Sequence, residues 1–162
     1  MTLHVILGMG CRDACPCATL QALACDALAA LPDCAVLHAI ACWQPREQHP
    51  ALTALATTLQ APLQAYTTQA LAFFSPQLTH RSEALYQRTG LWGIAEAAAL
   101  AEAAQRHRLG RKRLFYNSLH QSDASRSRLS SERLNKSWLL VPRRVARSGM
   151  ATAALAAFTF ND

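Results

Sequence analysis

The sequence predicts an α/β fold, a three-layer α/β/α sandwich with a mixed, mostly parallel central sheet. Short apolar runs alternate with helical segments from residue 3 onward. Such alternation is typical of parallel strands covered by helices on both faces. The last two predicted strands, 137–144 and 150–160, have no helix between them. We therefore expect them to pair antiparallel, which makes the sheet mixed.

The first half of the chain contains three expected strands. Branched residues dominate the runs at 3–9 and 35–43, which suits buried strands. Between them, apolar residues at a spacing of three to four predict a helix over 18–31, which Pro32 ends. A helix over 47–59, a strand over 62–66 and a brief helix through Phe73 follow.

The second half is less regular. Residues 74–92 are predicted to be irregular because Pro76 and Gly90 interrupt them. Good helix formers fill 94–107 and predict a helix. Residues 108–137 form an Arg- and Ser-rich insertion, with a strand edge at 113–117 and a mobile loop at 125–133.

Length and composition bound the class of protein. The 162 residues, with a mass of 17.7 kDa, are the size of a single domain spanning 1–162. No apolar run is long enough to cross a membrane. The first residues lack the basic start of a signal peptide, so a cytoplasmic location with six reduced cysteines is expected.

Positive charge is concentrated in one part of the chain. Residues 1–105 have a net charge of −3, whereas 106–147 have a net charge of +10. Such a field attracts anions, and arginine, which outnumbers lysine fourteen to two, grips carboxylates with two parallel hydrogen bonds. The segment is either a clamp for a polycarboxylate or a solvated loop. Nucleic acid is not an expected partner because no nucleic-acid-binding motif is present.

Four motifs occur in order along nearly the whole chain. They are the GMGCR segment at 8–12, Glu47 after the second strand, IAEAAAL at 94–100, and LLVPR at 139–143 followed by MATAA at 150–154. In this order they resemble the CobE/CbiG C-terminal family of cobalamin (vitamin B12) biosynthesis. The lysine that often precedes the family's acidic residue is replaced by Gln44, and a frequent serine by Gly93.

The resemblance implies an α/β/α domain with a role in assembly of the corrin ring. Three functions remain open. The first is binding of a precorrin or corrinoid intermediate, as a carrier or accessory factor. The second is hydrolysis of a precorrin lactone or acyl group. The third is a role as a scaffold for other enzymes of the pathway. Whether it is an enzyme is undecided, and no cofactor is expected.

A ligand site is expected where the first strand ends. Glycines let the backbone of Gly8, Met9, Gly10, Cys11 and Arg12 approach a ligand, and free N–H groups at a strand-to-helix turn can hold an anion. Precorrins carry many carboxylates. If the closing strands lie beside the first, Arg143 and Arg144 join Arg12 in binding these carboxylates.

Three residues are candidates for catalysis. Glu47 and Glu96 could act as general acid and base, although each also fits a structural role at the start of a helix. Cys11 at a helix start could be a nucleophile. Cys11, Cys15 and Cys17 have the spacing of a metal loop, but zinc needs a fourth ligand, so no metal is expected.

Overall fold

The computed structural model describes residues 2–119 and 138–159, with only the backbone described over 110–119. Five strands form one sheet in the order β3-β2-β1-β5-β4. Their bounds are β1 Leu3–Cys11, β2 Ala35–Trp43, β3 Leu63–Tyr66, β4 Trp138–Val145 and β5 Ala151–Phe158. The first three strands pair parallel, whereas β5 pairs antiparallel with both β1 and β4. Only β5 therefore runs against the others, which confirms the α/β class and the mixed sheet.

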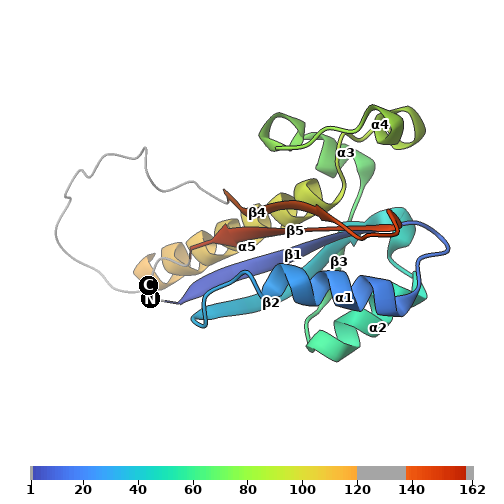
Figure 1. Cartoon of the computed structure of the whole chain (residues 1–162). Helices are drawn as coiled ribbons and strands as arrows, with labels where there is room; N and C mark the ends of the chain where they lie inside the picture. Colours follow the sequence, from blue (N-terminus) through green and yellow to red (C-terminus); the bar gives the residue numbers. More distant parts are fainter. Residues whose placement is uncertain (1, 120–137, 160–162) are drawn as a thin grey trace.

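Helices cover both faces of this sheet (Figure 1). They are α1 Cys17–Leu28, α2 Pro50–Leu59, α3 Thr68–Ala72, α4 Glu83–Thr89 and α5 Ala95–Leu119, with short 3-10 turns at Gln44–Arg46 and Ser75–Gln77. Side chains of α1 and α2 share one apolar core with Leu7 and Met9 of β1. Those of α5 share a second core with Ile6, which points to the opposite face. Within the described residues, no helix is both long and apolar enough to cross a membrane.

Several predicted bounds are corrected. The GMGC segment is the end of β1 rather than a turn, because β1 continues to Cys11 and α1 begins only at Cys17. The second helix begins at Pro50, a residue suited to the first helical position, with His49 as its cap. The segment 74–92, predicted to be irregular, contains α4.

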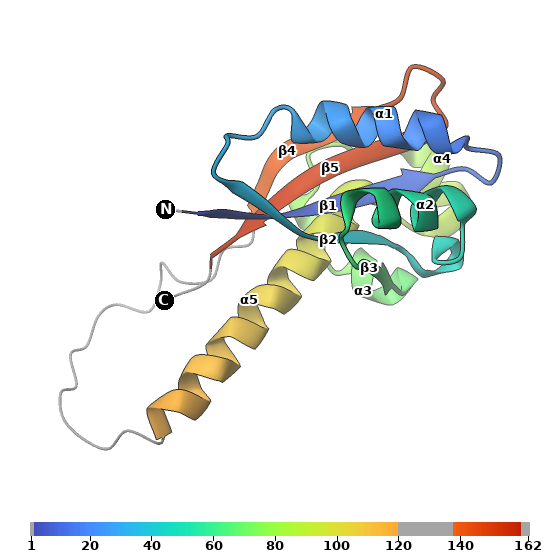
Figure 2. The same ribbon diagram turned by 90° about the horizontal axis from the view of Figure 1, so that it is seen from below.

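The predicted strand edge at 113–117 is wrong, because α5 continues through it to Leu119 (Figure 2). Arg, Lys and Leu are good helix formers, and they extend the helix beyond the predicted end at residue 107. The rest of the Arg- and Ser-rich insertion, including the loop predicted at 125–133, lies outside the described residues.

Helix α5 touches β1 at the level of the backbone. A Cβ atom placed on Gly8 would lie 1.9 Å from the carbonyl oxygen of Ala95 and 2.8 Å from the backbone nitrogen of Ala99. Only glycine permits this approach. The contact places the first turn of α5 against the carboxyl-terminal half of β1.

Replacing Gly8 with alanine is expected to destabilise the protein by about 2–3 kcal/mol, because the clash is with backbone atoms that cannot turn away. Urea denaturation measures the free energy of unfolding. Gly93→Ala is the control, because its Cβ would meet first the flexible end of Leu78 at 3.3 Å. A Gly8→Ala variant as stable as Gly93→Ala would contradict the backbone contact.

Candidate functional site: an arginine-lined cleft

A cleft of about 210 Å³ opens at the carboxyl ends of β1 and β4. This edge is where open α/β sheets commonly bind ligands. Its walls come from the end of β1, from α4, from β4 and from the β4–β5 turn. The lining residues are Gly10, Cys11, Arg12, Ser82, Leu85, Arg88, Ile94, Arg143, Val145, Gly149, Met150, Ala151 and Thr152.

Three arginines, Arg12, Arg88 and Arg143, line this cleft, and we call it the arginine cleft. Arg12 follows β1, Arg88 lies in the last turn of α4, and Arg143 lies on β4. No acidic side chain lines the cleft, and in the described part of the chain none of the three arginines forms an ion pair. An arrangement of this kind is chemically suited to bind an anion.

Arg143 adds a buried donor to this cleft. Its Nε atom is buried and has no hydrogen-bond partner among the residues that the structure describes. A buried donor without an acceptor costs about 1–3 kcal/mol, and a ligand oxygen would recover part of that cost.

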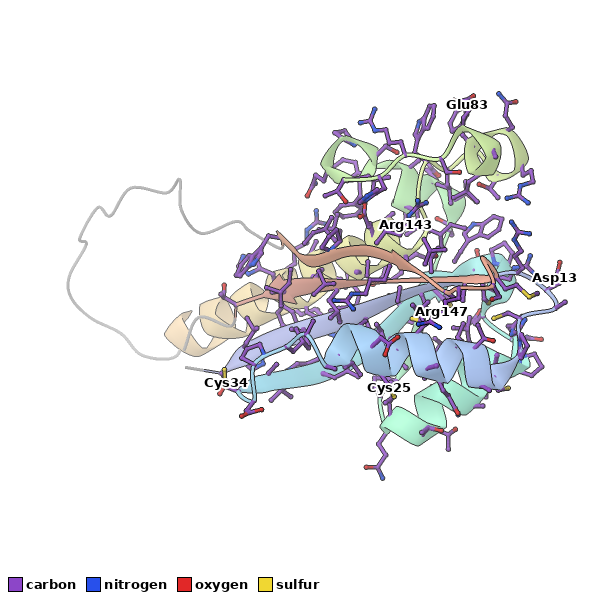
Figure 3. The ribbon with its side chains drawn as sticks, in the orientation of Figure 1. Asp13, Cys25, Cys34, Glu83, Arg143 and Arg147 are labelled. Carbon is purple, nitrogen blue, oxygen red and sulfur yellow. The ribbon has the colours of Figure 1, made fainter. Side chains whose placement is uncertain are left out.

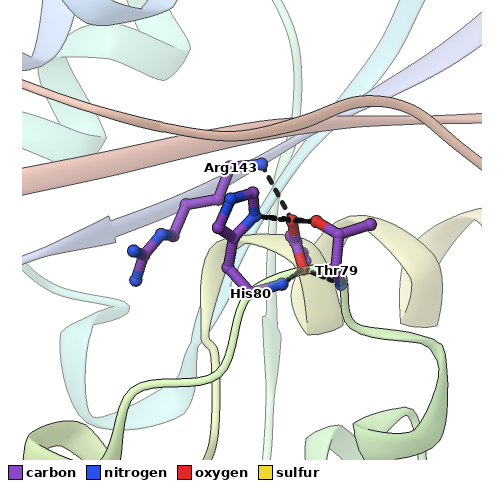
Figure 4. A network of polar contacts seen from close by, with 4 residues as sticks. Thr79, His80 and Arg143 are labelled. Atoms are coloured by element: carbon purple, nitrogen blue, oxygen red, sulfur yellow. Dashed lines mark hydrogen bonds and ion pairs between the residues drawn. The ribbon is translucent and has the colours of Figure 1, made fainter.

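The carboxylate of Glu96 holds the cleft walls together (Figure 4). Glu96 lies in the first turn of α5 and is 1 % exposed. It accepts hydrogen bonds from the backbone N–H of Arg143 at 2.8 Å, and from the backbone N–H and hydroxyl of Thr79. The backbone N–H of His80 donates to the Glu96 carboxylate at 3.4 Å. The Nδ1 atom of the His80 ring lies 3.5 Å from the same carboxylate. Glu96 thus ties β4 to the segment that leads into α4.

These donors decide the ionisation of Glu96. Burial alone would raise its pKa, because it disfavours the charged form. The hydrogen bonds from Thr79, Arg143 and His80 outweigh burial and lower the pKa below its ordinary value. The group is therefore a carboxylate at neutral pH.

The closing hairpin forms the floor of the cleft. The N–H of Arg12 donates to the carbonyl of Met150 at 2.9 Å, which links the end of β1 to the β4–β5 turn. A Cβ on Gly10 would lie 2.6 Å from the Thr152 hydroxyl, so glycine lets these two strands pack beneath the cleft.

Comparison with known proteins identifies the family of this fold. The sequence profile of the family described as cobalamin synthesis G C-terminus matches residues 5–156. The chain belongs to this family.

Relatives of this family member include Protein CobE from Sinorhizobium sp, which is 33% identical over 105 residues. The match covers 62% of this chain and 66% of that protein, slightly less than two thirds of its length. The homologues indicate that the chain takes part in cobalamin biosynthesis.

Two solved structures share the fold. One is CobE, described as a protein from the cobalamin (vitamin B12) biosynthetic pathway. The two structures superpose with a TM-score of 0.72 and are 27% identical in sequence. The match covers 100% of this chain and 95% of CobE. The other is the cobalamin biosynthesis protein chiG from Agrobacterium tumefaciens str. C58. Its TM-score is 0.58 at 18% identity, covering 96% and 98% of the two chains, so it supports the fold alone.

In this family member, the structure brings together some of the expected ligand residues and separates others. Gly10, Cys11, Arg12 and Arg143 line the arginine cleft. Gly8 and Met9 are buried packing residues beneath it, one against α5 and one in the core with α1 and α2.

Arg144 points to the opposite face of the sheet, where its Nη1 donates to the carbonyl of Asp26 in α1 at 3.2 Å. It lines a separate cavity with Arg147. Figure 3 shows Arg143 on the side of β4 toward α4, and Arg147 on the side toward α1.

The arginine that sequence reasoning missed is Arg88. Its helix, α4, has Ser82 as its N-cap, accepting from the N–H of Leu85, and Gly90 in a left-handed conformation at its end. A serine cap and a closing glycine are a helix signal that the sequence does contain. The interruption by Pro76 and Gly90 obscured it.

The candidate catalytic groups are dispersed. Cys11 lines the cleft, and Glu96 lies beside it with its carboxylate engaged by Thr79, His80 and Arg143. Glu47 is exposed after β2 and is not a lining residue. In the described residues, no three His, Cys, Asp or Glu side chains are placed to hold a metal ion.

Burial raises the pKa of the Cys11 thiol to about 11, with a further rise from neighbouring Cys15, and nearby Arg46 only partly opposes this. Cys11 is therefore a neutral thiol at physiological pH, a poor nucleophile.

Iodoacetamide at pH 7.5 is expected to alkylate the exposed Cys17, Cys25 and Cys34 before Cys11, because only the thiolate reacts and Cys11 is mostly protonated. Peptide mapping by mass spectrometry gives the order of modification. Alkylation of Cys11 ahead of the exposed cysteines would instead indicate an activated thiol.

Glu96→Gln is expected to lower the free energy of unfolding at pH 7 by about 1–3 kcal/mol, because an amide cannot accept from all the donors of the carboxylate. The folded pKa of Glu96 is lowered, so its stabilisation is present above the ordinary pKa near 4.5 and is lost as pH falls through the folded value. The difference between wild type and variant should therefore shrink below about pH 4.

Glu83→Gln is the control for that experiment, since it removes an equal charge from an exposed position on α4. A difference between wild type and Glu96→Gln that stays constant from pH 7 to pH 3 would contradict the role of the ionised carboxylate.

Proposed function

We propose that the chain binds a precorrin or corrinoid intermediate through its side-chain carboxylates in the arginine cleft, as a carrier or accessory factor of cobalamin biosynthesis. The observation that carries the proposal is the convergence of Arg12, Arg88 and Arg143 without an acidic partner among the residues that line the cleft.

The chemistry of the cleft matches that of the ligand. Guanidinium groups bind carboxylates with paired, charge-assisted hydrogen bonds. Precorrins carry many carboxylates, and the homologues connect the chain with the pathway in which these molecules are made. The buried Nε of Arg143 favours a ligand that brings an acceptor into the cleft.

The candidate catalytic groups favour binding over hydrolysis. The raised pKa keeps Cys11 protonated, and hydrogen bonds already occupy the oxygens of Glu96. Glu47 does not line the cleft. None of the three offers a free base or nucleophile next to a ligand held by the arginines.

Arg12→Glu is expected to weaken binding of hydrogenobyrinic acid, a cobalt-free corrinoid, by at least about tenfold, because the variant places a negative charge against the ligand's carboxylates. A titration followed by the visible spectrum measures the affinity. The affinity of the wild-type protein should also fall steeply between low and high salt.

Arg147→Glu is the matched control, because it makes the same charge change at an exposed residue outside the cleft. Equal affinity of wild type and Arg12→Glu would refute the site. No spectral change at high protein concentration would count against this corrinoid as the ligand.

A further inference from the structure

The enclosed volume of the arginine cleft suits acidic side arms better than a corrin macrocycle. The volume of the cleft is about 210 Å³. Pockets for drug-sized ligands usually measure about 300–1,000 Å³, and a macrocycle with its side arms is larger than such ligands. What fits into the cleft is a short acidic side arm.

The number of guanidinium groups exceeds what one such arm needs. A carboxylate has two oxygens, and a single arginine can satisfy both with a bidentate pair of hydrogen bonds. Arg12, Arg88 and Arg143 approach from three separate elements, the end of β1, α4 and β4. Three groups from three directions suit two or more carboxylates.

The rest of the lining fits the stems of acidic arms. Leu85, Ile94, Val145 and Met150 add apolar surface to the lining of the cleft. Methylene groups that join a carboxylate to a ring can pack against such surface. Among the described residues, a cavity of about 450 Å³ between α3 and α5 is lined by a single arginine, Arg108. A cavity of about 710 Å³ beside α1 is lined by Arg144 and Arg147 but also by the acidic Asp26, so neither cavity repeats this pattern.

We infer that the arginine cleft grips two or more neighbouring carboxylate arms on one edge of its ligand at once, while the macrocycle stays outside. This inference rests on the proposed function. It adds what determines the ligand specificity of the cleft, which would recognise a cluster of free carboxylates rather than the macrocycle. Each further arm binds as an intramolecular event and raises the affinity without a new pocket. Esterified or amidated arms lose the charge that the arginines select.

Small carboxylates test the clamp separately from corrinoid binding. The probes are propane-1,2,3-tricarboxylate, which carries three neighbouring acids, and propionate, which carries one. The ¹⁵Nε resonances of the arginines are followed by NMR at constant ionic strength. The tricarboxylate is expected to shift the signals of Arg12, Arg88 and Arg143 at roughly 10–100-fold lower concentration than propionate.

Two variants sharpen the result. Arg88→Gln removes one guanidinium from an exposed position on α4. It should reduce several-fold the ratio between the propionate and tricarboxylate concentrations that are needed to shift the signals. Arg147→Gln, which makes the same change outside the cleft, should leave that ratio unchanged.

The clamp would be overturned if both probes shifted the arginine signals at the same concentration. It would also be overturned if the tricarboxylate shifted the signal of Arg147 as strongly as those of the cleft arginines. If hydrogenobyrinic acid still binds in that case, the proposed function stands and only the clamp fails. If the tricarboxylate binds as expected but the corrinoid does not, the clamp stands and the proposed ligand fails.

Discussion

The arginine cleft depends on one buried carboxylate. Removing the charge of Glu96 from water costs several kcal/mol, and only well-placed donors can offset that cost. The donors come from β4 and from the segment ahead of α4, far apart in sequence. By holding these two segments together, Glu96 sets how far Arg143 on one wall stands from Arg88 on the other. The carboxylate supports the cleft through the segments that it holds, because hydrogen bonds from these segments engage both of its oxygens.

The position of Glu96 follows in turn from how closely α5 lies on the sheet. Gly8 has no side chain, and the facing turn of α5 is built from alanines such as Ala95 and Ala99. The helix therefore rests on the backbone of β1, and its first turn lies next to the carboxyl end of that strand. A larger residue at Gly8 would lift the helix and move the carboxylate away from the N–H of Arg143. The geometry of the cleft therefore depends on the packing of small residues between α5 and β1.

Electrostatics then separates this cleft from the other cavities. Like charges brought together in one cleft repel one another, and an anionic ligand would relieve that repulsion. Arg144 and Arg147 line a different cavity, which Asp26 also lines. Arg144 donates a hydrogen bond to the backbone carbonyl of Asp26 there. Two neighbouring arginines on β4 therefore face different surroundings, and of the two only Arg143 lines the arginine cleft.

Local patterns in the sequence predict the class of fold, the order of strands and helices in the first half and the antiparallel closing pair, all of which the structure confirms. These features follow from local patterns: apolar runs, helix formers, glycines and charge. The family followed from motifs in order. The tertiary structure alone decided that Arg88 joins the cleft, that Arg144 leaves it and that Glu96 is held by donors from two other segments. Adjacent strand residues point to opposite faces, so the position of an arginine depends on sheet register, and register is a long-range property of hydrogen bonding that no local pattern contains.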